Sequence, residues 1–260
     1  MVSKLIKKSF KYFSLFFLLV IAGNLFAQKD INDSLKKAND LYQTKNYEQA
    51  ELIYLSLVNQ GYKGTELFFN LGNTFYRENK LGLAILYYNK ALVISPGDED
   101  IKYNLDIANS RMVDKIDTLP EFFPFQWWES ILSLFNLSGW TYLSYFLFLL
   151  LLVSISLYFL VKRIKIQRTS FFIGLVLLFF LIISAIFTSV RLNRELNERN
   201  GIILNNVVVV KLSPDEKSND AFVIHEGLKV KLEDKVDNWI KIRLHDGKVG
   251  WITDSNVGTI

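Results

Sequence analysis

Two long runs of apolar residues dominate the hydrophobic pattern of this 260-residue chain. No charged residue interrupts residues 140–161 or residues 170–190. Each run has about 20 residues, which is enough for a helix to cross the roughly 30 Å hydrocarbon core of a membrane. The pattern therefore predicts two transmembrane helices, at 140–161 and 170–190, joined by a short loop at 162–169.

A third apolar run lies near the N-terminus, behind a basic segment with four lysines in residues 1–11. A basic start, an apolar stretch and a small residue at Ala27 are typical of a secretory signal peptide. The bulky Leu25, two residues before Ala27, leaves an uncleaved membrane anchor open as the alternative. Residues 1–27 are predicted to be one or the other, and both would export the segment that follows.

The distribution of charge indicates topology and argues against a nucleic-acid partner. The formal net charge is +4, and residues 1–11 and 162–168 carry four cations each without an acid, so the rest of the chain is net negative. Loops rich in Lys and Arg stay on the cytoplasmic side of a membrane. We therefore expect the protein to lie in the inner membrane, with the basic loop at 162–169 in the cytoplasm and both flanking regions in the periplasm.

Two segments before the apolar runs match each other at an offset of about 34 residues, a spacing found in helical repeats. Small residues at fixed places let paired helices approach closely, aromatic rings fill the space between them, and proline ends a helix. The second copy is the clearer, with Leu71, Gly72, Phe75, Ala84, Tyr88, Ala91 and Pro96. The first has Ala38, Leu41, Tyr47, Ala50, Tyr54 and Leu57, with Tyr62 in place of the closing proline.

This pattern is similar to tetratricopeptide repeats, which have the same period. The similarity covers residues 31–117, where the last part is expected to be a capping helix. That helix has apolar residues at helical spacing, which are Ile101, Leu105, Ala108 and Met112.

The resemblance implies that a concave face of the repeats binds peptides. Its groove would be lined by Asn39, Tyr42, Gln43, Asn70, Asn73, Tyr76 and Arg77. The three asparagines resemble part of the carboxylate clamp of some members, but Leu35, Asp100 and Asn104 occupy the places of its cations, so binding of a C-terminal carboxylate is not supported. Hydrogen bonding between helices or to solvent is the alternative role of the asparagines, which leaves Tyr76 and Arg77 as the expected contacts.

Residues 118–139 form an aromatic linker that is too short to be another domain. Trp and Phe favour the boundary of a bilayer, so an interfacial amphipathic helix starting near Trp127 is expected. A partner-binding motif is the alternative.

After Gly201 the pattern changes to short alternating runs separated by turn residues, which predicts a small barrel of about five strands over residues 202–260. The order of these runs resembles a bacterial SH3-type domain. Trp251 is expected to pack in the core, whereas Trp239 resembles the tryptophan of the ligand groove and is either a contact residue or core. The run Val207–Val210 replaces the paired tyrosines that bind proline-rich peptides, so that ligand is not supported.

No pattern for catalysis is found. The chain has no Cys, no phosphate-binding glycine loop and only two histidines, His225 and His245, which are interpreted as surface turn residues. We expect no enzyme activity, no cofactor and no metal.

The order of signal, repeats, two-span hairpin and SH3-type module resembles the BatE-type proteins of the Bacteroides aerotolerance (Bat) operon. The fold class is thus a multidomain membrane protein with an all-α repeat module, two transmembrane helices and an all-β SH3-like barrel. The resemblance implies a scaffold, linked to oxidative-stress tolerance, that works beside von Willebrand factor A-type membrane proteins and a MoxR-type ATPase.

The alternative is a cell-wall sensor or anchor that binds peptidoglycan through the barrel. A transporter is disfavoured because neither span contains an ionisable residue.

Overall fold

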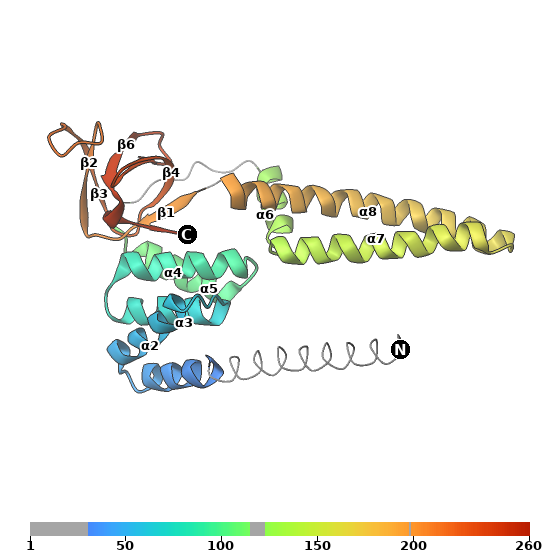
Figure 1. Ribbon diagram of the computed structural model, residues 1–260, viewed down its shortest axis with the longest axis horizontal. Helices are drawn as coiled ribbons and strands as arrows, with labels where there is room; N and C mark the ends of the chain where they lie inside the picture. The colour runs from blue at the N-terminus through green and yellow to red at the C-terminus, as the bar shows by residue number, and fades with distance from the viewer. Residues whose placement is uncertain (1–30, 115–122, 198) are drawn as a thin grey trace, which may run out of the picture.

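The computed structural model describes residues 31–114, 123–197 and 199–260. The predicted signal peptide or anchor lies outside these residues, as do the end of the predicted capping segment and the start of the predicted linker. In the described ranges the chain forms a helical region, a hairpin of two apolar helices and a C-terminal antiparallel sheet (Figure 1). The coarse predicted layout is therefore confirmed.

The helical region repeats its backbone geometry at the interval that the sequence predicts. Helices α3 and α5 begin 34 residues apart, at 65 and 99, and the second helices of the pairs begin at 47 and 81, again 34 residues apart. The turns inside the pairs match as well, because Lys45 and Asn79 both have positive φ, at 62° and 60°. After the helix at 31–43 come α2 (Tyr47–Asn59), α3 (Thr65–Arg77), α4 (Leu81–Ile94) and α5 (Glu99–Ser110).

Close packing inside the repeats follows the predicted pattern. A Cβ atom on Gly72 would lie 2.7 Å from two ring atoms of Tyr88, so only glycine lets α3 approach α4 this closely. Proline cannot continue a helix, and α4 ends at Ile94, two residues before Pro96. The core of the region is formed by the predicted residues, among them Ala38, Ala50, Tyr54, Leu57, Leu71, Phe75, Ala84, Tyr88 and Ala91.

Helix α5 covers the open end of the second pair, as predicted for a capping helix. Asp98 caps it, since its Oδ1 accepts hydrogen bonds from the backbone N–H groups of Asp100 and Ile101. Ile101 and Ala108 are buried against the repeats.

Two apolar helices, α7 (Leu137–Leu160) and α8 (Ile164–Asn197), run side by side away from the rest of the molecule (Figure 1). Both are long and apolar enough to cross a membrane, and only 6% and 11% of their most apolar windows are buried. The predicted loop at 162–169 is shorter than expected, because α8 already begins at Ile164. Lys165 and Arg168 therefore lie on its first turns.

The seam between these helices contains small polar side chains. Ser154 Oγ donates to the carbonyl of Ser170 at 2.6 Å, and Ser144 Oγ lies 2.8 Å from Ser184 Oγ. In the predicted linker, α6 (Phe123–Leu132) is helical and starts before Trp127. Leu132 packs with residues from the base of the hairpin.

The C-terminal region is a seven-stranded antiparallel sheet in the order β3-β2-β6-β5-β4-β1-β7, rather than about five strands. It curls around a core of aliphatic residues (Figure 1). Gly227 and Gly247 have φ of +88° and +89°, as expected for glycines in turns. The elements are β1 (Asn200–Ile203), β2 (Val207–Lys211), β3 (Asp220–His225), β4 (Lys229–Val236), β5 (Trp239–Arg243), β6 (Val249–Thr253), η1 (Asp254–Asn256) and β7 (Val257–Thr259).

The helical region and the sheet pack against each other, with α4 beside β1 and β7. Glycines allow the close approach on both sides. A Cβ on Gly82 of α4 would lie 2.7 Å from the carbonyl oxygen of Ile203, and a Cβ on Gly258 would lie 2.5 Å from a methyl group of Leu86. The two regions therefore form one packed body at the base of the hairpin.

Candidate protein-binding surfaces

Asn39 joins three helices in the first repeat. Its Oδ1 accepts hydrogen bonds from Tyr54 Oη at 2.6 Å and from Asn70 Nδ2 at 3.0 Å, while its Nδ2 donates to Glu66 at 3.1 Å. Burial, with a smaller contribution from the charge of Glu66, raises the pKa of Tyr54, so its hydroxyl stays protonated and donates. The polar atoms of Asn39 are thus engaged inside the helical region.

The same arrangement occurs one repeat later. Asn73 Oδ1 accepts hydrogen bonds from Tyr88 Oη at 2.8 Å and from Asn104 Nδ2 at 2.9 Å. Burial raises the pKa of Tyr88 in the same way. Asn39, Asn70 and Asn73 therefore form the helix-to-helix hydrogen bonds that the sequence left open as their alternative role.

Tyrosines and arginines form a second periodic feature, at the C-terminal ends of the first helices. Arg77 Nε donates to Tyr42 Oη at 3.5 Å, and the Arg111 guanidinium lies 4.4 Å from the ring centroid of Tyr76. Tyr76 and Arg111 follow Tyr42 and Arg77 by one repeat. Gln43 is exposed and has no side-chain hydrogen bond in the described structure.

Sequence reasoning did not include Arg111, although its position one full repeat after Arg77 could have identified it. Both guanidinium groups are exposed, and neither forms an ion pair with a carboxylate of the described residues. Tyr42, Tyr76, Arg77 and Arg111 are called the Tyr–Arg face below. Its cations and aromatic rings suit acidic or aromatic side chains of another protein.

The structure corrects the prediction for Trp251. Along β6, Gly250 and Ile252 point into the core, which places Trp251 on the outer face, where it is half-buried. Trp239 is also half-buried on that face, because the neighbouring Ile240 points into the core. The two tryptophans lie on adjacent strands, since Trp251 pairs with Lys241, two residues after Trp239.

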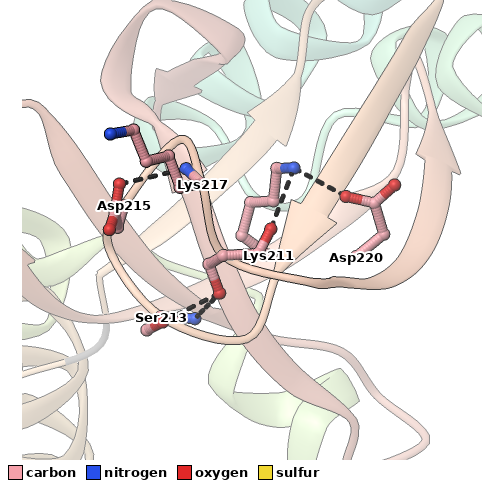
Figure 2. Close-up of polar contacts among 6 residues, drawn as sticks. Lys211, Ser213, Asp215, Lys217 and Asp220 are labelled. Carbon is pink, nitrogen blue, oxygen red and sulfur yellow. Dashed lines mark hydrogen bonds and ion pairs between the residues drawn. The ribbon is translucent and has the colours of Figure 1, made fainter.

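The loop between β2 and β3 is braced by its own polar contacts (Figure 2). Lys211, which pairs with Trp251, directs its Nζ to Asp220 at 2.6 Å. Farther along, Ser213 Oγ donates to Ser218 Oγ at 2.8 Å, and Asp215 accepts from the backbone N–H of Lys217 at 3.0 Å. These bonds hold the loop at the end of β2, where Lys211 pairs with Trp251.

The prediction that His225 is a surface turn residue is wrong. Its backbone N–H donates to Asp114 at 2.6 Å, and its Nδ1 lies 2.9 Å from the other carboxylate oxygen. The next residue, Glu226, accepts a hydrogen bond from the N–H of Gly82 at the start of α4. The last residue of β3, His225, and the turn after it join the sheet to the helical region. His245 is exposed on a turn as predicted.

Among the described residues, no group of three or more His, Cys, Asp or Glu side chains is placed to hold a metal ion. The expectation of no enzyme activity remains a prediction. A scan of the chain against protein-family models and a search of curated proteins find no match.

Proposed function

We propose that this protein is a membrane-anchored scaffold without catalytic activity, which presents two protein-binding modules on one side of a bilayer. The observation that carries the proposal is the pair of exposed apolar helices, α7 and α8, projecting from one packed body. A core helix of a soluble protein would be mostly buried, whereas these helices are not. Lipid is the environment that fits such surfaces.

The regular period of helices, turns and hydrogen bonds supports a tetratricopeptide repeat module, and the curled sheet supports an SH3-type module. In the proposed scaffold the Tyr–Arg face contacts a partner protein. Given the resemblance to BatE-type proteins, the partners would be von Willebrand factor A-type membrane proteins and a MoxR-type ATPase system, in a complex linked to oxidative-stress tolerance.

We assign the hairpin to the inner membrane, with its tip in the cytoplasm and both modules in the periplasm. Four cations at residues 162–168, at the tip, support this orientation. The packing of α4 against β1 supports placing both modules on the same side, because a membrane between them would prevent that contact.

Single-cysteine labelling tests this topology, because the natural chain has no Cys. Variants Asn59→Cys, Glu216→Cys and Arg163→Cys place a thiol on the helical region, the sheet and the hairpin tip. In spheroplasts, a membrane-impermeant maleimide should label the first two at once and Arg163→Cys only after lysis. Labelling of Glu216→Cys that also requires lysis would refute the proposed topology, and loss of the chain from carbonate-washed membranes would refute anchoring.

A second candidate, anchoring to the cell wall, is favoured by the outer-face position of Trp239 and Trp251. Half-buried tryptophans on an open face can stack on sugar rings or apolar groups. In this case the detergent-solubilised chain should sediment with peptidoglycan sacculi in moderate salt, and Trp239→Ala should lower the bound fraction at least about fivefold, the loss of about 1 kcal/mol. Equal sedimentation of Trp239→Ala and the natural chain would remove this candidate.

A further inference from the structure

A pocket of about 270 Å³ lies where the helical region, the hairpin and the sheet meet. Val93 lines it from α4, Leu137 from the start of α7 and Asn200 from β1. Arg191 and Arg194 line it from the last turns of α8. The pocket therefore combines apolar side chains with two cations.

Arg191 is half-buried and has no ion-pair partner among the described residues. Its Nη2 donates to the carbonyl of Leu132 at 2.9 Å. Its Nε is enclosed, and no hydrogen-bond acceptor of the described residues reaches it. The charge of Glu129 acts on Arg191, but that carboxylate is bonded to Arg194. A guanidinium that is partly removed from water and bonded to no carboxylate favours an external anion.

The neighbouring arginine is already neutralised. Arg194 donates to both carboxylate oxygens of Glu129, at 2.8 and 2.5 Å, and these bonds lower the pKa of Glu129. Glu195 also lines the pocket, but it is exposed, so water and salt screen its charge. Arg191 is thus the arginine of the pocket that is bonded to no carboxylate.

The pocket lies at the end of the apolar part of the hairpin. Arg191 directly follows the uncharged stretch 170–190 of α8, and Leu137 comes three residues before the stretch of α7 that starts at Trp140. In a bilayer this is the level of the headgroups, where cations meet lipid phosphates. We infer that the pocket binds the headgroup phosphate of an anionic phospholipid, with Arg191 as the main contact. The inference rests on the membrane anchoring proposed above.

The apolar lining favours a lipid over a free phosphate ion. Val93 is 55% exposed, and together with Leu137 it offers hydrocarbon that a glycerol backbone and the first acyl methylenes would cover. Leu137 also begins α7, whose exposed apolar side chains provide a surface for the rest of the acyl chain.

Native mass spectrometry of the full chain in neutral detergent tests this site, with phosphatidylglycerol and phosphatidylcholine supplied at equal concentrations. We expect phosphatidylglycerol to occupy the protein about fivefold more, the effect of one cation near a lipid surface. Arg191→Gln should remove the preference. Arg168→Gln, at the other end of α8, should leave it unchanged.

Arg191→Gln also removes the hydrogen bond from Arg191 to the Leu132 carbonyl, which could displace α6. A second variant keeps this hydrogen bond. Asn200→Asp adds a negative charge to the pocket, leaves that contact in place and should also remove the preference. Equal occupancy by the two lipids in the natural chain would overturn the inference, as would displacement of phosphatidylglycerol by millimolar inorganic phosphate. If cysteine labelling shows an inserted hairpin and the preference is still absent, this inference fails and the proposed anchoring stands.

Discussion

Replacement of Gly82 by valine is expected to separate the helical region from the sheet while both remain folded. The new Cβ would lie 2.7 Å from the carbonyl oxygen of Ile203 and 3.1 Å from the Cα of Leu204, and backbone atoms cannot rotate away. Overpacking of this kind costs about 3 kcal/mol. Valine has a slightly higher helix propensity than glycine, so α4 itself should not be weakened.

Hydrogen exchange of the full chain in detergent measures this separation. Amides of β1 and β7 should exchange about a hundredfold faster in Gly82→Val, which corresponds to about 3 kcal/mol of lost protection, whereas those of α3 and β5 should not change. Gly64→Ser is the control, since a Cβ there meets no atom within 4 Å and Gly64 is the N-cap of α3, a position that serine favours. Unchanged exchange in β1 would show that the packed body does not exist in solution.

The helical region could be predicted closely because its pattern is local. Gly72 opposite Tyr88 predicts that the two helices pack closely. Pro96 predicts where the second helix ends. Gly72 and Tyr88 meet within the same repeat. The recurrence of the pattern one repeat earlier then tests it against a second copy.

Contacts between regions could not be predicted, because no local pattern marks them. Glu226 accepts from Gly82, which is 144 residues away, and His225 contacts Asp114 at a separation of 111 residues. Neither acid belongs to a pattern that marks it in the sequence, and Asp114 falls within the predicted repeat segment 31–117. The docking of the sheet on α4 follows only once both regions are folded.

The error at Trp251 has a different cause. Successive residues of a strand point to opposite faces, so a shift of one residue exchanges core and surface. The position of β6 is set by Gly250, where an added Cβ would collide with a methyl group of Val210. Tryptophan is highly buried on average, but in β6 the residues that point into the core are Gly250 and Ile252.

Replacement of Asn73 by alanine is expected to destabilise the helical region by about 2–3 kcal/mol. The change removes the acceptor shared by Tyr88 and Asn104, and it leaves a buried hydroxyl without a partner. Asn59→Ala, at an exposed site near the end of α2, is the control and should cost less than about 0.5 kcal/mol. The free energy of opening of α3 and α4, obtained from hydrogen exchange, measures both.

A double-mutant cycle with Tyr88→Phe separates the structural role of Asn73 from a role in ligand binding. Without the hydroxyl, loss of Asn73 should cost at least about 1 kcal/mol less, because the buried donor is already absent. The pair Asn39 and Tyr54, one repeat earlier, should give the same coupling, since its geometry is the same. If the effects are additive in both repeats, the hydrogen bonds of Asn39 and Asn73 do not stabilise the helices. The asparagines would then be contacts for a partner in the groove, as the resemblance to tetratricopeptide repeats implies.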